Sequence, residues 1–197
     1  LGACANFATN KMTHSLSRAI VNEDDPDTVR DGVPAYLLLI DGLILDDPDN
    51  QDLLVSGARL DSAYASAFVN DVDRAKRLTR KALNYGRRAL CLRRSVFCAA
   101  DSVRYENFIA ALAKTDKNDI SAMYANATSW AGWLQVRSAD PAALSDLPKI
   151  EAMLERIIAL DENFENGQAH LYLGIMRSQL PAALGGQPEI GKRHFER

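Results

Sequence analysis

The sequence predicts an all-α fold in which about nine helices form an antiparallel helix-hairpin array. Apolar residues recur at intervals of three and four, and no stretch alternates strictly enough to form a sheet. Six of the seven prolines follow a boundary signal and precede a helical pattern, as at Pro26, Pro34, Pro48, Pro141, Pro148 and Pro188. Proline is tolerated in the first helical turn, where an aspartate before it can cap the helix.

The apolar period also places each helix along the chain. The expected helices cover about 6–22, 27–45, 50–69, 71–92, 101–113, 118–138, 148–160, 166–180 and 188–197, with a short helical turn near 141–146. Pro181 falls late in a helical pattern and should end it.

Part of this array resembles degenerate tetratricopeptide repeats. The link at 160–164 leads to Ala169 and then to Gly174, the pattern in which one repeat ends and the next begins. A small residue at position 174 lets the paired helix approach closely. Gly191, with Phe195 four residues later, fits the second helix of that repeat.

The first four residues, Leu-Gly-Ala-Cys, match the end of a bacterial lipoprotein signal, in which Cys4 accepts the lipid. A chance match is the alternative, because the motif is short. We expect the signal to end in residues 1–4, a tether over 5–11, and one helical domain over 12–197 whose final helix continues beyond the last residue.

Lipidation of Cys4 would leave an even pair, Cys91 and Cys98, in an oxidising compartment. We expect a disulfide between them if the chain turns near 93–95. Two buried free thiols are the alternative.

Composition and motifs bound the function. The net charge of −3 provides no overall field for nucleic acid. The three histidines have no zinc-ligand spacing with the cysteines, and the sequence has neither a glycine-rich phosphate loop nor a nucleophile elbow. We therefore expect no enzyme, no metal and no cofactor.

Aromatic residues on the predicted helices are candidates for a ligand cleft or for core packing. Trp130 and Trp133 lie on one helix, and Tyr64 and Phe68 lie four residues apart on another. In a repeat array the inner helices line a concave face, so such residues can serve both roles. With His170 as a polar anchor, these five residues form the predicted cleft.

Residues 74–94 hold nine basic side chains and no acidic one. A solvated helix face is one interpretation. The other is docking to an acidic partner or to lipid headgroups, for which the candidates are Arg74, Arg77, Arg80, Lys81, Arg87 and Arg88.

Taken together, the chain resembles the TRAP transporter T-component family. The similar segments run through most of the chain, namely 34–44, 63–69, 74–78, 130–133 (Trp-Ala-Gly-Trp), 147–150, 167–174 (Gly-Gln-Ala-His-Leu-Tyr-Leu-Gly) and 180–186 (Leu-Pro-Ala-Ala-Leu-Gly-Gly).

The resemblance implies a periplasmic lipoprotein, anchored to the membrane, that partners the solute-binding P-component of a TRAP transporter. It further implies cryptic tetratricopeptide repeats around a channel or cleft, a homo-oligomer such as a trimer, and a small ligand that could be hydrophobic. A repeat lipoprotein that assembles proteins without carrying a ligand is the alternative.

Overall fold

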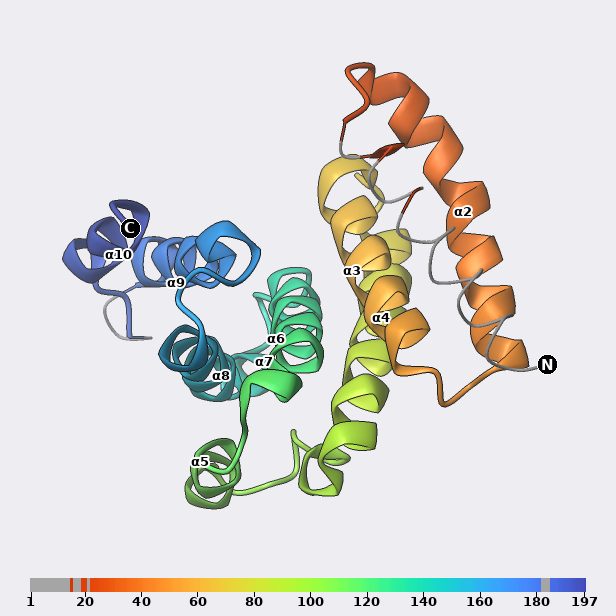
Figure 1. The fold of residues 1–197 in the computed structure, drawn as a ribbon. Coiled ribbons are helices and arrows are strands. Elements are labelled where there is room, and N and C mark those ends of the chain that lie inside the picture. Colours follow the sequence, from red (N-terminus) through yellow and green to blue (C-terminus); the bar gives the residue numbers. More distant parts are fainter. Residues whose placement is uncertain (1–14, 16–18, 21, 182–184) are drawn as a thin grey trace.

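The computed structural model describes residues 15, 19–20, 22–181 and 185–197, and these form helices and turns with no strand (Figure 1). The predicted all-α fold is confirmed. Nine α-helices fall within the described residues, although α7 has only four residues. Cys4 and the tether over 5–11 lie outside the described residues, as does most of the helix expected at 6–22.

The described helices begin and end close to the predicted positions. They are α2 (Pro26–Asp46), α3 (Gln51–Phe68), α4 (Val72–Arg93), α5 (Tyr105–Leu112), α6 (Ile120–Gln135), α7 (Pro141–Leu144), α8 (Leu147–Leu160), α9 (Gln168–Gln179) and α10 (Pro188–Phe195). Side chains of Asp25, Asn50, Asp71 and Asp140 accept backbone N–H bonds and so cap α2, α3, α4 and α7.

Pro34 does not begin a helix, so that interpretation is wrong. α2 begins at Pro26 and continues through Pro34. A proline inside a helix leaves the carbonyl four residues earlier without its N–H donor. That carbonyl belongs to Arg30, and the Tyr64 hydroxyl of α3 donates to it at 3.1 Å.

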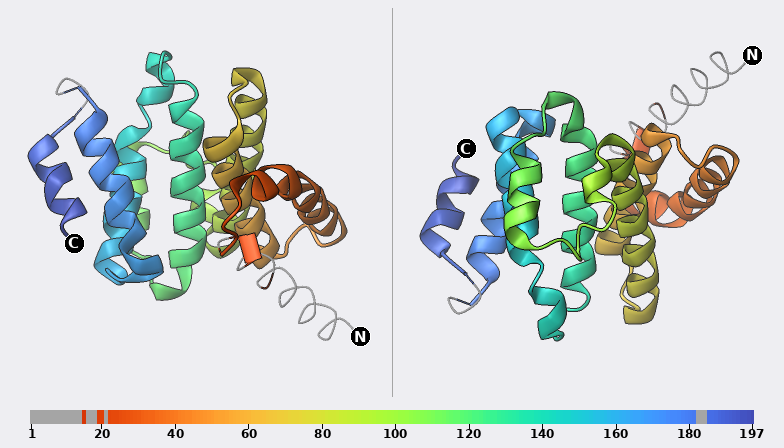
Figure 2. Two further views of the ribbon diagram at one scale, coloured as in Figure 1. Left: turned by 90° about the horizontal axis from the view of Figure 1, so that it is seen from above. Right: turned by 90° about the horizontal axis from the view of Figure 1, so that it is seen from below.

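The helices stack in a row. α3 packs against α4 and α6, α4 against α6, α6 against α8, α8 against α9, and α9 against α10, whereas α2 lies at one end and packs mainly on α3. Figure 2 shows α6, α8, α9 and α10 side by side. None of the helices within the described ranges has the length and apolar character of a membrane span.

Small residues bring α4 close to its neighbours. Ala82 and Ala89 are fully buried on α4, and Gly86 lies between them. A β-carbon at Gly86 would lie 2.9 Å from the Asn126 Cα of α6. In the same way, a β-carbon at Gly174 would lie 2.5 Å from the Phe195 ring of α10. The close approach predicted at position 174 is therefore present.

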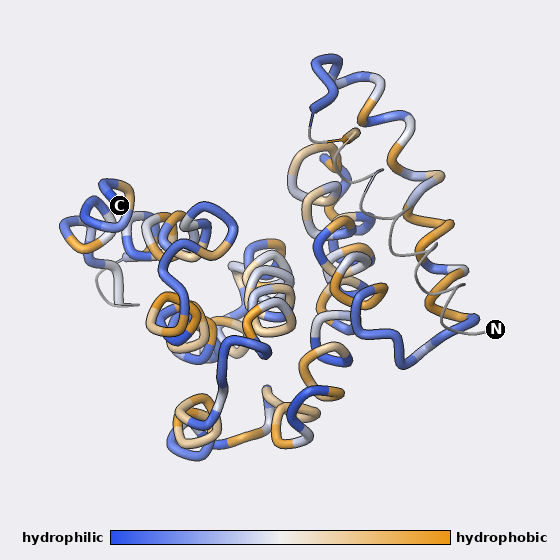
Figure 3. Tube along the Cα trace, in the orientation of Figure 1, coloured by the Kyte–Doolittle hydropathy of each residue, from blue (hydrophilic) through white to orange (hydrophobic). Residues whose placement is uncertain are grey.

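The main core follows from this stack. Its largest fully buried side chains come from α2, α3, α4, α5, α6, α8 and α9 and from the turn at Phe97. A smaller cluster of Val33, Leu37 and Tyr64 joins α2 to α3. Figure 3 shows polar and apolar stretches alternating along the helices, with a hydrophilic linker between α2 and α3.

Candidate functional site

A cleft of about 630 Å³ lies between α4 and the segment formed by α6 and α7. One wall is a single face of α4, where Arg77, Arg80, Asn84 and Arg87 follow one another at steps of three and four. The opposite wall contains Trp133 and Leu134 of α6 and the turn that leads into α8.

The two indoles differ in their access to this cleft. Trp130 is only 1% exposed, packs edge-on against Phe108 with ring centroids 6.5 Å apart, and belongs to the core. The Arg87 guanidinium covers its ring at 5.5 Å. Trp133 is only partly buried, and Arg137 lies over its ring at 4.9 Å. Trp133 is therefore the indole that a bound molecule would meet.

The lining is cationic. Five basic side chains and two aspartates take part, namely Arg77, Arg80, Lys81, Arg87, Arg137, Asp101 and Asp146. Lys81, Arg87 and Arg137 each form ion pairs with aspartates. Burial raises the pKa of Asp146, and the neighbouring Asp101 adds to the shift while Lys149 and Arg87 oppose it.

Lys81 links the cleft to three helices. Its ammonium lies 2.6 Å from Asp41 Oδ2 and 3.1 Å from Asp61 Oδ1, and the Tyr85 hydroxyl donates to Asp41 at 2.8 Å. Burial raises the pKa of Asp61 to about 6, although Lys81 acts in the opposite direction. Burial and the bond to Asp41 raise the pKa of Tyr85. This network fixes one end of the cationic face.

The structure does not bring the five predicted cleft residues together. Tyr64 and Phe68 contact each other between α2 and α3, with ring centroids 5.7 Å apart. His170 lies at the other end of the row, with its Nδ1 atom 2.8 Å from Nδ1 of His194. Each of these residues packs within its own helix pair, so only Trp130 and Trp133 line the cleft.

The predicted docking residues divide into two groups. Arg77, Arg80, Lys81 and Arg87 line the cleft. Arg74 lies outside it and covers the Tyr64 ring at 5.5 Å. Arg88 also lies outside it and donates to the Pro48 carbonyl.

Three charged residues of the cleft, Arg137, Asp101 and Asp146, were not predicted from the sequence. Arg137 follows Trp133 by four residues, a spacing that could have indicated their contact. Asp101 and Asp146 gave no such signal, because their positions depend on Lys149. The buried Lys149 ammonium donates to the carbonyls of Ala100 and Asp101, at 3.1 and 2.7 Å, and so holds the loop beside the cleft.

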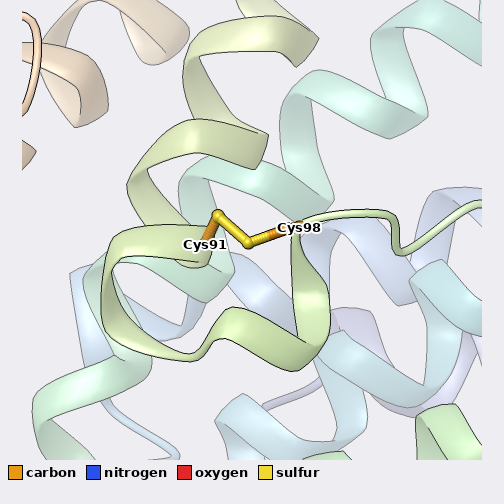
Figure 4. Close-up of a disulfide and its surroundings, with 2 residues drawn as sticks. All are labelled: Cys91 and Cys98. Atoms are coloured by element: carbon orange, nitrogen blue, oxygen red, sulfur yellow. A yellow bond between two sulfur atoms is a disulfide. The ribbon is translucent and has the colours of Figure 1, made fainter.

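A disulfide joins Cys91 near the end of α4 to Cys98 in the turn that precedes this loop (Figure 4). The two Cα atoms lie 4.5 Å apart. In the described part of the chain, no group of three or more histidine, cysteine or carboxylate side chains is arranged to hold a metal ion.

No curated protein matches the chain, but a protein-family model does. The family model described as TRAP transporter T-component matches residues 22–197, which cover every helix from α2 to α10. The chain therefore belongs to the TRAP transporter T-component family.

Proposed function

We propose that this chain is a lipid-anchored periplasmic component that docks the solute-binding P-component and carries a small ligand in the cleft between α4 and α6. Family membership makes the chain an accessory component of a TRAP transporter, acting in the cell envelope. The ligand-carrying part of the proposal rests on one observation, the cleft of about 630 Å³ at Trp133. Small-molecule sites commonly measure ~300–1,000 Å³.

The anchor belongs to the proposal because Cys4 lies outside the described residues. Its test is fractionation of cells that express the chain with its natural signal. Wild-type protein should sediment with membranes, and the Cys4→Ser protein should be released with the periplasmic fraction. A Cys4→Ser protein that stays with membranes would refute the lipid anchor.

Docking is supported by the exposed cations of α4, which would raise the rate of encounter with an acidic surface in a salt-sensitive way. Arg74 and Arg88 offer the sharper test because they lie outside the cleft. Replacing both with glutamate should slow association with the purified P-component, as measured by surface plasmon resonance at low salt. An unchanged association rate would exclude this face of α4 as the docking surface.

Ligand carriage is tested at Trp133 rather than at both tryptophans, because Trp130 is a core residue whose truncation would destabilise the fold. Native mass spectrometry of protein purified from the envelope of the cells that naturally produce it should show a bound small molecule. The Trp133→Ala protein should lose that mass while keeping its helical circular dichroism. If wild type and Trp133→Ala retained the same fraction of bound small molecule, the cleft would not be the ligand site.

The second candidate is a scaffold that binds proteins without a small ligand. The cationic lining favours it, since a carrier of apolar molecules would have an apolar cleft. Purified protein without any small molecule, together with undiminished binding of the P-component, would support the scaffold.

A further inference from the structure

We propose that the cleft binds an organic anion with a flat apolar body, whose acid group is held by Arg77 and Arg80 and whose body lies against Trp133. This inference rests on the proposed function, because it assumes that the cleft carries a ligand. It departs from the hydrophobic ligand that the family resemblance suggested.

Two arginines of the cleft have a positive charge that no described acidic side chain compensates. Lys81 is shared by Asp41 and Asp61, Arg87 pairs with Asp101 at 3.3 Å, and Arg137 pairs with Asp140. Among the described residues, neither Arg77 nor Arg80 has an ion pair or hydrogen bond. Two guanidinium groups one helical turn apart therefore face the cleft with their charge uncompensated.

Arg87 adds a buried donor. Its Nε atom is buried without a hydrogen-bond partner in the structure, although its Nη2 atom reaches Asp101. A buried donor left without an acceptor lowers the stability of the protein, so an acceptor that reaches it is favoured. Because the Arg87 guanidinium also lines the cleft, a small shift of its side chain would offer this N–H to an acid oxygen of a ligand.

The apolar part of the ligand is assigned to the opposite wall. Trp133 is partly buried, and Leu134 and Ala143 continue the same lining. Arg137 already lies over the Trp133 ring at 4.9 Å, so a planar group of the ligand would pack against the part of this indole that lines the cleft and not between the two side chains.

The same features disfavour other ligand classes. A neutral apolar molecule would remove the guanidinium groups from water without giving them an acceptor, which costs free energy. An inorganic anion would make no use of Trp133. Guanidinium groups bind carboxylates and phosphates with paired N–H donors, so the acid group can be either.

Isothermal titration calorimetry with matched probes tests the proposal, using the full chain without the P-component so that docking cannot affect the result. The probes are 2-naphthoate, its neutral analogue 2-naphthylmethanol, and inorganic phosphate. We expect 2-naphthoate to bind at least about tenfold more tightly than 2-naphthylmethanol, because a hydrogen bond from a guanidinium to a charged acceptor is stronger than one to a neutral hydroxyl. Phosphate alone should bind more weakly than 2-naphthoate.

Matched variants then assign the contacts. Replacing Arg77 and Arg80 with glutamine should remove the preference for 2-naphthoate and leave the affinity for 2-naphthylmethanol unchanged. The control replaces Arg74 and Lys76, which lie outside the cleft on the same helix, with glutamine and should keep the preference. The Trp133→Leu protein should bind both naphthyl probes more weakly.

Three results would overturn the inference, and they separate anion recognition from ligand carriage. Equal affinity for 2-naphthoate and 2-naphthylmethanol, or a full preference for the anion in the Arg77 and Arg80 variant, would refute anion recognition while ligand carriage at the cleft survives. Wild-type protein that binds neither naphthyl probe at millimolar concentration would refute both the inference and carriage at this cleft.

Discussion

The Tyr64 hydroxyl donates a hydrogen bond to the backbone carbonyl of Arg30, at a distance of 3.1 Å. That carbonyl precedes Pro34 by four residues and so receives no N–H from within α2. A side chain of α3 thus replaces a missing backbone bond of α2 and fixes the contact between the two helices.

A double-mutant cycle tests this relationship. Tyr64→Phe should lower the free energy of unfolding by about 1 kcal/mol, because it leaves the Arg30 carbonyl without its donor. In a Pro34→Ala background the same change should cost less, since an alanine at this position supplies an N–H to that carbonyl. Urea unfolding of the four proteins measures the coupling, and strictly additive effects would contradict this account.

The raised pKa of Asp61 predicts a pH dependence of stability. Because the folded protein holds this proton up to about pH 6 and the unfolded chain releases it near 3.8, the free energy of unfolding should fall as pH rises between these values. The full loss corresponds to at most about 3 kcal/mol. Urea unfolding of wild type and Asp61→Asn from about pH 4.5 to about pH 7.5 measures the upper part of this decline.

The Asp61→Asn protein should lack this decline. The difference between its free energy of unfolding and that of wild type should therefore shift in favour of the variant as pH rises towards about 7. Asp73→Asn is the control, because its side chain is 81% exposed and its curve should run parallel to wild type. If wild type and Asp61→Asn gave parallel curves, the buried carboxyl would not be the source.

Two glycines predict opposite effects of the same substitution. A β-carbon at Gly86 would meet the backbone of α6, at 2.9 Å from Asn126 Cα and 3.0 Å from the Ala125 carbonyl oxygen. Gly86→Ala should therefore destabilise the fold by about 1–3 kcal/mol. Gly42 on α2 has no atom within 4 Å of such a carbon, and Gly42→Ala should stabilise by up to about 1 kcal/mol. Thermal unfolding of both variants would reveal the opposite signs, and a stabilised Gly86→Ala protein would refute the close approach of α4 and α6.

Reduction of the Cys91–Cys98 bond should lower the free energy of unfolding by about 2–3 kcal/mol, because the bond closes a loop across a sequence separation of 7. Urea unfolding with and without a phosphine reductant measures this change. The protein with both cysteines replaced by serine is the control, since the reductant should not affect it. An unchanged midpoint for wild type would mean that the thiols are not bonded in solution.

The helices were predictable from the sequence because their signals are local. The apolar period placed most of the described helices, and the aspartates before Pro26 and Pro141 cap α2 and α7 as that pattern indicated. The sequence wrongly placed a helix start at Pro34, because the Tyr64 hydroxyl that makes a proline tolerable inside α2 comes from another helix.

The cleft was only partly predictable, because a periodic pattern shows which face of a helix is apolar but not which faces of two helices meet. Tyr64 and His170 each lie on such a face, and each is buried within its own helix pair. The contact between the cationic face of α4 and the Trp133 side of α6 depends on Gly86, whose role appears only when both helices are present.

The placement of α4 between α3 and α6 separates two sets of positions on one helix. Residues 75, 82, 86 and 89 are buried and small, and a β-carbon at position 86 would meet the backbone of α6. Residues 77, 80 and 84 point away from that packing and can be exchanged at little cost to stability. Related chains could therefore acquire new ligand preferences by substituting these outward positions alone, on a helical frame that stays unchanged.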